Sequence, residues 1–311
     1  MKIGKPQNKE DWDQYLISKE ASFTQSINWG EFKAKNQRVE RFEVRENNHV
    51  KGVCQFLEES NPFGEYFYVP YGPVGDSTEI EERLLEKIKE LAKKEDKFMI
   101  KVEPRKDLRI GQASHHRIQP KKTLVKDITD EPKKILKSFD EGTRYDVRYS
   151  KRKGVKIKKG KSKKSIENFF KLLKKTQKRK DFDSFSKNYF ENMLKILDTG
   201  LFLAFSKEGE VVATTIFGYF GKIATSLHSG FDYEKRDLRA TALIRFEAIK
   251  ESRKRGCEKF DAWGIDKEKM PGVTKFKKGF GGEEVSYPEA KDIPIKKIKY
   301  QGYSLAAKIV K

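Results

Sequence analysis

The sequence predicts an α/β protein with mixed (α+β) sheets, arranged as two tandem domains that share one order of elements. Three observations support this prediction. The chain has 311 residues, which exceeds the usual size of a single hydrophobic core. A unit of helix, hairpin, strand, helix and strand recurs about 160 residues later, as in a duplicated domain. A hydrophobic content of 36%, with 22 Phe and 12 Tyr, is compatible with folded cores rather than disorder.

The first unit begins with two predicted helices and a hairpin. Ser22 is the expected N-cap of the second helix, with Gln25 in the capping-box position. A polar turn at residues 46–48 joins the two hairpin strands. A proline-bracketed strand end and an amphipathic helix follow, the helix with apolar residues three or four positions apart. The expected elements are helices at 11–19 and through 29–33, a hairpin at 40–57, a strand at 64–74, a helix at 77–97 and a strand at 98–104.

The second unit repeats this order with different residues. FEVRENNHVKGVCQF in the first unit and FLAFSKEGEVVATTIF in the second share a strand, a polar turn, a valine with a small residue, and a strand. The shared feature is a pattern of elements more than sequence identity. The expected elements are helices at 165–178 and 188–197, a hairpin at 201–220, a strand at 222–231, a helix at 240–256 and a strand at 257–265.

A glycine-rich segment follows the last strand of the second unit. Its motif FKKGF (276–280) lies between Gly272 and the pair Gly281-Gly282. Glycines permit close backbone approach, and the two lysines of the motif are suited to a negatively charged group. A solvated loop after a core strand is the alternative interpretation.

The composition excludes several classes of protein. The N-terminal residues contain no apolar signal core, and no run approaches the ~18 apolar residues of a membrane span, so we expect a cytoplasmic protein. Cys54 and Cys257 are predicted to be buried, reduced thiols. His115, His116 and Asp127 lack metal-ligand spacing. We find no phosphate loop and no nucleophile elbow, and therefore expect neither a cofactor nor a metal.

The net charge of +21 is concentrated in two segments. Residues 144–180 hold 17 Lys and Arg against Asp146 and Glu167, and residues 291–311 hold six Lys against Asp292. The rest of the chain is nearly neutral. Local positive charge of this kind favours a polyanion or an anionic surface as partner. Lysines on solvated faces are the alternative interpretation.

The order of elements resembles that of acyltransferases of the GNAT superfamily. Members that use acetyl-CoA hold its pyrophosphate on a Gln/Arg-x-x-Gly-x-Gly/Ala turn at a helix N-terminus, where backbone N–H groups face the phosphate. Residues 236–241 occupy this position here with the sequence RDLRAT. Arg239 stands at the place of the first glycine, and its side chain would obstruct the phosphate. An acetyl-CoA donor is therefore disfavoured.

Six segments in the same order resemble the FemABX family of peptidoglycan bridge-forming aminoacyltransferases, over nearly the whole chain. They are QSINWGEFK, YVPYGPV, IQPKKTLVKDI, RYDVRYSKRKGVKI, TQKRKDFDSFSKNYF, and ALIRFEAIKESRKRGCEKFDAWGI with FKKGFGGEEVSYP. The resemblance implies two tandem GNAT-like domains. We expect the first to span residues 1–132 with a C-terminal segment, about 295–311, that returns to it, and the second to span 133–294.

The resemblance also implies an activity. Such enzymes transfer an aminoacyl group from a charged tRNA to a side-chain amine of a peptidoglycan stem peptide, with a UDP-linked or lipid-linked muropeptide as acceptor. The reaction is aminolysis of an ester, which needs a neutral amine and stabilisation of an oxyanion. One alternative is a GNAT-type N-acyltransferase with a different donor or a non-murein amine acceptor. Another is a non-catalytic RNA-binding or membrane-binding relative.

The matched motifs suggest individual roles. Lys277 matches the functional lysine after phenylalanine in the family and is the expected cation near the tRNA 3′ end or the tetrahedral intermediate, with Phe276 packed beside it. A surface lysine and a core phenylalanine are the alternatives. Glu103 is expected to orient or deprotonate the amine, or to end a strand. The residues expected to bind substrate are Lys33, Tyr71, Arg179, Tyr189 and His228.

Two departures from the family pattern concern the acceptor. Phe185 stands where relatives often carry a basic residue, and His228 stands where they tend to have tyrosine. His228 is a candidate general base, with a structural histidine as the alternative. For the RNA backbone we expect contacts from Arg144, Arg148, Lys151, Arg152 and Lys153, with salt-sensitive affinity. Anionic lipid headgroups at the inner membrane face are a rival partner for the same charge.

Overall fold

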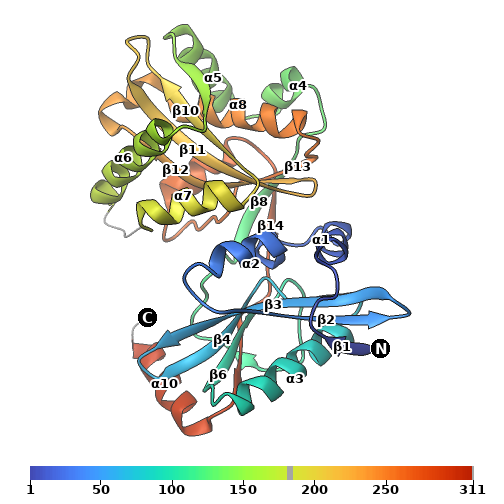
Figure 1. Ribbon diagram of the computed structural model, residues 1–311. Helices are drawn as coiled ribbons and strands as arrows, with labels where there is room; N and C mark the ends of the chain where they lie inside the picture. The colour runs from blue at the N-terminus through green and yellow to red at the C-terminus, as the bar shows by residue number, and fades with distance from the viewer. Residues whose placement is uncertain (181–184, 310–311) are drawn as a thin grey trace. The chain divides into compact units, whose positions relative to one another are not determined.

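The computed structural model describes residues 1–180 and 185–309 and divides into two compact units (Figure 1). Unit 1 comprises Met1–Lys121 and Ser286–Lys311, and unit 2 comprises Lys122–Val285. Each unit is built on one mixed β-sheet with helices on both faces. The predicted α/β class with two tandem units is confirmed, and the C-terminal segment belongs to unit 1.

The sheet of unit 1 has the strand order β1-β2-β3-β4-β6-β15-β7, and β5 pairs with β3. β4 and β6 are parallel, whereas the other neighbours are antiparallel. The elements are β1 (Lys2–Gly4), α1 (Lys9–Ser18), α2 (Ile27–Lys33), β2 (Val39–Glu46), β3 (His49–Asn61), β4 (Gly64–Pro70), β5 (Val74–Gly75), α3 (Thr78–Lys94), β6 (Met99–Glu103), β7 (Gln112–Ala113), β15 (Lys291–Pro294) and α10 (Lys297–Ile309).

Helix α3 covers one face of this sheet, and α1 and α2 cover the other (Figure 1). The apolar side of α3 and alternate residues of β2 and β3 form one buried cluster, as the spacing of its leucines and isoleucines predicts. The start of α2 differs from the expectation. Ser26 caps α2, whereas Ser22 caps a preceding 3₁₀ turn. The amide of Gln25 instead bonds the backbone of Gln55 and Pro70.

The sheet of unit 2 has the strand order β14-β8-β13-β12-β11-β10-β9. Helices α5 and α8 pack on one face, and α6 and α7 on the other (Figure 1). The elements are β8 (Lys122–Asp127), α4 (Pro132–Lys137), α5 (Glu141–Arg152), β9 (Lys156–Gly160), α6 (Lys163–Lys180), α7 (Lys187–Ile196), β10 (Thr199–Phe205), β11 (Val211–Phe220), β12 (Ile223–Phe231), α8 (Ala240–Lys254), β13 (Lys259–Asp261), α9 (Pro271–Lys278) and β14 (Glu283–Ser286).

Unit 2 is one continuous segment of the chain, whereas unit 1 is made of two segments that lie before and after it. β8, which follows directly on unit 1 in sequence, pairs with β13 in unit 2. β15, which follows unit 2, returns to pair with β6 and β7 in unit 1. The unit boundaries therefore fall at 121/122 and 285/286, earlier than the expected boundaries after residues 132 and 294. Both cysteines are free and buried, as predicted.

Candidate active site

The amine of Lys277, a residue of α9, lies just beyond the carboxyl end of β13 in unit 2. β12 and β13 are parallel neighbours only as far as the Thr225–Asp261 pair. The antiparallel pairing of β13 with β8 continues beyond this point, where Ala262 N donates to Leu124 O. The carboxyl ends of parallel strands are a common position for ligands. Lys277 Nζ donates to the carbonyl oxygens of Trp263 (3.1 Å) and Gly264 (2.6 Å) at this end.

A helix that the sequence did not predict positions Lys277. The sequence analysis predicted no helix in the glycine-rich segment and gave a solvated loop as the alternative interpretation. Pro271–Lys278 instead forms α9 with proline in its first turn, where the missing N–H has no consequence. The glycine after α9 has a packing reason. A Cβ on Gly279 would lie 2.2 Å from Thr143 Oγ1 and 3.0 Å from Asp140 Oδ2. Only glycine therefore allows α9 to end against the N-terminus of α5.

The environment of Lys277 favours the neutral amine. Burial, and to a smaller extent the positive charge of Arg245, lower the pKa of Lys277 to about 7, against the opposing attraction of Asp261. The Asp261 carboxylate accepts hydrogen bonds from Trp263 N, at 2.7 Å, and from the Thr123 hydroxyl. Lys277 therefore exchanges a proton near neutral pH, which ordinary surface lysines do not do.

Arg245 is a residue of this site that the sequence analysis missed. It belongs to α8, is 6% exposed, and its guanidinium carbon lies 5.1 Å from the ring centre of Phe276 and 5.4 Å from that of Phe280. Its Nη1 has no hydrogen-bond partner among the described residues. Burial lowers its pKa to about 10. The sequence did contain a signal for this residue. Arg245 lies three positions after Ala242 and four before Ile249, so the helical spacing places it on the apolar, core-facing side of α8.

Phe276 links these two cations. Its ring is half-buried, lies 5.2 Å from the ring of Phe280 in an edge-on arrangement, and faces Arg245. Because Phe276 directly precedes Lys277 in α9, a shift of its ring would move the lysine. The expected packing role of Phe276 agrees with this arrangement.

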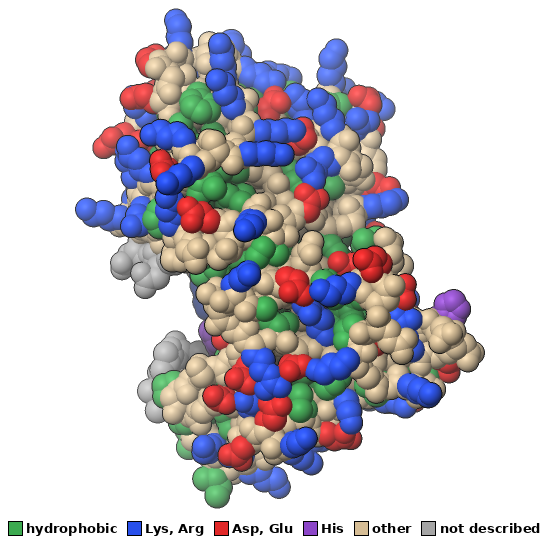
Figure 2. Space-filling model, in the orientation of Figure 1, with side chains coloured by type: hydrophobic (Ala, Val, Ile, Leu, Met, Phe, Trp, Pro, Cys, Tyr) green, Lys and Arg blue, Asp and Glu red, His purple; other side chains and the backbone are tan. Residues whose placement is uncertain are grey.

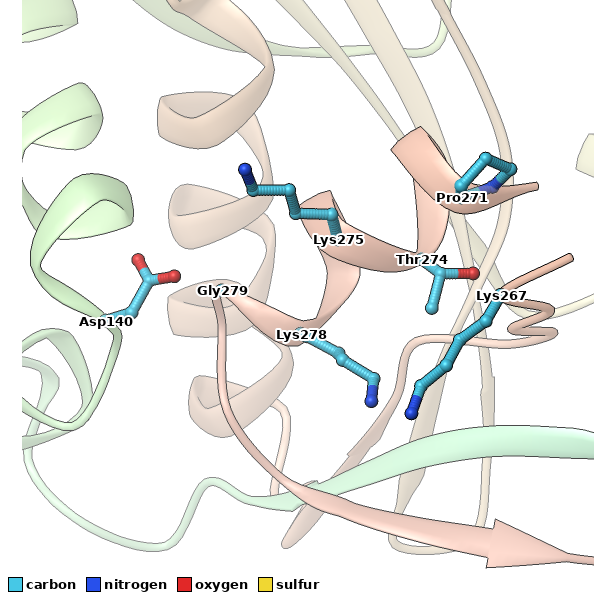
Figure 3. Close-up of a pocket in the computed structure, with 7 residues that line it drawn as sticks. All are labelled: Asp140, Lys267, Pro271, Thr274, Lys275, Lys278 and Gly279. Carbon is cyan, nitrogen blue, oxygen red and sulfur yellow. The ribbon is translucent and has the colours of Figure 1, made fainter.

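A shallow pocket of about 320 Å³ lies beside α9 (Figure 3). Figure 3 shows the side chains of Lys267 and Lys278 next to each other, while Lys275 extends toward Asp140. Lys278 forms an ion pair with Glu284. Lys277 is not among the lining residues, because its amine is directed to the carbonyl groups after β13. We therefore base the site on Lys277 and not on this pocket.

Tyr189 and His228 come together in an aromatic cluster of unit 2. The ring of Phe185 stacks on that of Tyr189 at 3.8 Å, and His228 lies edge-on to Phe190 at 5.0 Å. Burial among these rings lowers the pKa of His228 to about 4 and raises the pKa of Tyr189. His228 is therefore neutral at physiological pH. No carboxylate partner of its ring is found within the described residues.

Arg179 lies at the end of α6 over the exposed ring of Tyr233, at 4.5 Å from the ring centre, and Arg236 lies over the same ring at 4.6 Å. The adjacent Arg239 precedes α8 with φ of +53°. This is the left-handed region that favours glycine. The backbone thus keeps the conformation of a glycine turn while the side chain occupies its space.

Tyr71 and Glu103 in unit 1 both hold the segment at residues 118–120. The buried Glu103 carboxylate accepts hydrogen bonds from Tyr68 Oη (2.7 Å), Gln119 N (3.0 Å) and Ile118 N. The Tyr71 hydroxyl donates to Pro120 O at 2.6 Å. Glu103 is 0% and Tyr71 2% exposed. Both side chains thus hold the segment at residues 118–120, and their expected roles toward a substrate stay predictions.

Lys33 ends α2 in unit 1 with its ammonium 5.7 Å from the ring centre of Trp29. Burial lowers its pKa, against the attraction of Glu59. A lysine in a half-buried position of this kind is suited to an anionic ligand. The position is consistent with the expected contact to a substrate phosphate.

The basic residues of α5 differ in what they contact. Arg144 donates to the carbonyl of Phe139, and Lys151 pairs with Glu247 at 3.2 Å. Arg148, Arg152 and Lys153 are exposed. Tyr145, 53% exposed, stacks on Tyr149 at 5.6 Å, and Arg152 lies over both rings. Aromatic rings thus accompany the positive charge on this helix.

The comparisons with known proteins agree with this architecture. A family model described as "FemAB family" matches residues 8–115, 110–208 and 203–308. The chain belongs to the FemAB family. The resemblance inferred from the motifs is confirmed.

Among curated FemAB relatives, the lipid II:glycine glycyltransferase of Staphylococcus epidermidis is 30% identical over 190 residues, which covers 52% of this chain and 45% of the relative. The enzyme of the same name from Staphylococcus haemolyticus is 29% identical over 191 residues, with the same coverage. The chain thus spans about half the length of the curated relatives it matches.

Solved structures extend the likeness to the whole fold. The crystal structure of FemX has a TM-score of 0.85 at 20% identity and covers 98% of this chain and 100% of that one. A tandem GNAT protein from the clavulanic acid pathway has a TM-score of 0.54 at 12% identity, covering 94% and 97%. At these identities the likeness shows the fold alone, and it supports the two GNAT-like units of this FemAB chain.

Proposed function

We propose that this FemAB chain is an aminoacyltransferase that moves an amino acid from a charged tRNA to the side-chain amine of a peptidoglycan precursor stem peptide. The observation that carries the proposal is Lys277, a half-buried lysine with a pKa near neutrality, whose amine donates to carbonyl groups just beyond the carboxyl end of β13. The names of the curated relatives specify lipid II and glycine. They support a lipid-linked acceptor, and a UDP-linked muropeptide is the soluble equivalent.

The reaction forms an amide bond between the acceptor nitrogen and the aminoacyl carbon and breaks the ester bond to the tRNA 3′ oxygen. The acceptor nitrogen loses a proton, and the leaving oxygen gains one. Lys277 in its protonated form stabilises the oxyanion of the tetrahedral intermediate, to which one donor contributes roughly 3 kcal/mol. With a pKa of about 7, Lys277 also gives a proton to the leaving oxygen more readily than an unperturbed lysine.

The remaining candidate residues fall into two groups, those that would contact a substrate and those that would position other residues. Arg179 is exposed beside Tyr233, and Lys33 keeps a half-buried ammonium, so we assign both to anionic groups of the substrates. Tyr189 and His228 offer a ring surface to the acceptor. Tyr71, Glu103 and Phe276 act as positioning residues.

The tRNA donor is assigned to the exposed side of α5. Arg148, Arg152 and Lys153 would face phosphates, and the Tyr145–Tyr149 pair would contact exposed bases. Arg144 and Lys151 contribute positive charge although each already has a protein partner. We propose that the protein acts in the cytoplasm, at the inner membrane face when the acceptor is lipid-linked.

A second candidate is transfer to a non-murein amine. Phe185 stacked on Tyr189 and the uncharged His228 form an aromatic surface where relatives tend to carry a basic residue and a tyrosine. Such a surface favours an acceptor with fewer anionic groups.

The test uses the full chain with tRNA carrying labelled amino acids, and with UDP-linked and lipid-linked muropeptides or simple amines as acceptors. Mass spectrometry measures the gain in acceptor mass. We expect transfer by the wild type and by the control Lys278→Met, and a loss of at least about a hundredfold in Lys277→Met. Gain only on a simple amine would favour the second candidate. No gain from any charged tRNA, with tRNA binding retained, would overturn the assignment as a transferase.

A further inference from the structure

Helix α10 carries the two most exposed large hydrophobic side chains of the described residues. Ile298 is 85% and Leu305 63% exposed, whereas the next in order are Met1 and Tyr145, each at 53%. Ile298 and Leu305 are seven positions apart, which places them on the same side of a helix two turns apart. An isolated exposed leucine would be ordinary. Ile298 and Leu305 on one side of α10 together form an exposed apolar stripe.

The opposite side of α10 fixes the orientation of the helix. Tyr300 is 4% exposed and donates to Asp292 Oδ2 at 3.1 Å. The ring of Tyr303 lies 5.8 Å from that of Phe98, and Ser304 Oγ lies 2.9 Å from His115 Nε2. The stripe is therefore exposed because the other side of α10 is anchored in unit 1, and not because the helix lacks contacts.

Lysines accompany the exposed stripe. Lys297, Lys299 and Lys308 are exposed, and the sequence of α10, KIKYQGYSLAAKI, contains no acidic residue. Lys296, just before the helix, pairs with Asp96. Figure 2 shows hydrophobic side chains next to lysines over the part of the surface that α10 forms. A short apolar stripe flanked by basic residues is typical of a helix that lies in the interface of an anionic membrane.

We propose that the exposed side of α10 docks on an anionic lipid surface, with Ile298 and Leu305 at the level of the acyl-chain boundary and the lysines at the headgroups. A second copy of this chain fits the surface less well. Pairing two stripes would bring the lysines of both copies together, and two side chains cover much less than the ~800 Å² per partner of a stable interface. The inference goes beyond the proposed transfer reaction and holds for any donor or acceptor.

The test measures binding of the full chain to vesicles by flotation, with phosphatidylcholine alone or mixed with phosphatidylglycerol. We expect binding to the mixed vesicles only, and weaker binding as salt increases. The double variant Ile298→Ser with Leu305→Ser should lower the partition coefficient roughly tenfold or more. Lys297→Gln with Lys308→Gln should weaken binding to a similar extent. The charge-matched control Lys93→Gln with Lys94→Gln, on the exposed side of α3, should bind as the wild type does.

Two outcomes would overturn the proposal. Equal vesicle binding by the wild type and the serine variant would remove α10 from the membrane contact. Conversion of a dimer to a monomer by the serine substitutions, seen by sedimentation without lipid, would assign the stripe to contact between copies. Transfer to a UDP-linked acceptor, measured on the same proteins, separates this result from a failure of the proposed reaction, since that acceptor needs no membrane.

Discussion

At the residue scale, Lys277 differs from two other half-buried lysines, Lys33 and Lys126, in having a second cation close by. Burial lowers the pKa of Lys33 and of Lys126 as well, but nearby carboxylates oppose the change in both cases. At Lys277 the positive charge of Arg245 adds to the effect of burial. Arg245 itself lies against phenylalanine rings and keeps an unpaired Nη1 among the described residues. Lys277 and Arg245 together place positive charge at a site where we propose that a substrate develops negative charge.

We predict an alkaline limb in the pH dependence of kcat/KM. If the protonated Lys277 is the active form, kcat/KM falls as pH rises through its pKa of about 7. Lys277→Arg removes this limb, because arginine stays charged to high pH. Arg245→Met shifts the limb upward by about one pH unit, because one positive neighbour is lost. Steady-state kinetics between pH 5.5 and 9 measure both changes.

A stability measurement is the control for Arg245→Met. A buried cation without a charged partner is unfavourable, so its replacement by methionine should leave the free energy of unfolding unchanged or raise it. Urea unfolding checks this expectation. A limb that stays at the same pH in a stably folded Arg245→Met would show that Arg245 does not act on Lys277.

His228 gives a second prediction. Its pKa is lowered from 6.5 to about 4 in the folded state, so the unfolded chain binds a proton between these values and the folded chain does not. The contribution of His228 to stability is therefore present above pH 6.5 and lost as pH falls toward 4. His228→Phe should lose less stability between pH 7 and pH 4.5 than the wild type does, as measured by urea unfolding. The control His49→Gln, at an exposed position, should follow the wild type.

The sequence motifs pointed to which residues lie at the candidate site around Lys277, but they did not show what each side chain contacts. Lys277 and Phe276 follow from the motif FKKGF, and they meet at one site. Glu103 and Tyr71 match motifs equally well, but their polar atoms are engaged with the segment at 118–120. A motif does not show which hydrogen bonds a side chain forms. Arg245 was missed because its significance depends on rings from β13 and α9, which are distant in sequence.

At the scale of elements, long-range contacts explain where the predictions differ from the structure. The Ser22 capping box was plausible locally, but Gln25 is directed inward to the backbone of β3 and β4, so the cap of α2 moves to Ser26. The segment after β13 appeared to be a loop because of its glycines. It forms α9, and Gly279 directly after the helix packs against Asp140 and Thr143 at the start of α5, a contact between segments far apart in sequence.

A buried ion pair fastens β15 into the sheet of unit 1. Lys101 and Asp292 are opposite each other in β6 and β15, with Nζ and Oδ1 2.9 Å apart, at 1% and 0% exposure. We predict that Lys101→Met or Asp292→Leu alone costs about 3–5 kcal/mol, because each leaves a buried charge unpaired. The double variant should cost clearly less than the sum. Additive losses in urea unfolding would show that the two side chains do not act as a pair.

At the scale of the whole molecule, most of the excess of positive charge lies in residues 144–180 and 291–311. Three neighbouring exposed cations of α5, Arg148, Arg152 and Lys153, are the ones we assign to tRNA phosphates. We predict that replacing all three by glutamine weakens tRNA binding and lowers the slope of log K against log[salt] by about 2, since each single-strand phosphate contact contributes roughly 0.7. Fluorescence anisotropy at several salt concentrations measures the slope. Lys93→Gln with Lys94→Gln should leave it unchanged.

The duplicated order of elements was visible in the sequence, because each helix and hairpin has a local pattern. The unit boundaries were not, since β8 and β15 look alike as short strands whichever sheet they join. Their sheets are decided by pairing with β13 and β6, which no local pattern encodes.

The discontinuity of unit 1 in sequence has a consequence for synthesis on the ribosome. Residues 1–121 emerge first, yet their sheet lacks the strand between β6 and β7 until Lys291–Pro294 has been translated. Unit 2 is one continuous segment, Lys122–Val285, and is translated before β15. Unit 2 can therefore finish folding before unit 1. A nascent chain that stops short of β15 would present an open sheet edge to proteases and chaperones, so the last part to be translated decides whether the first part is stable.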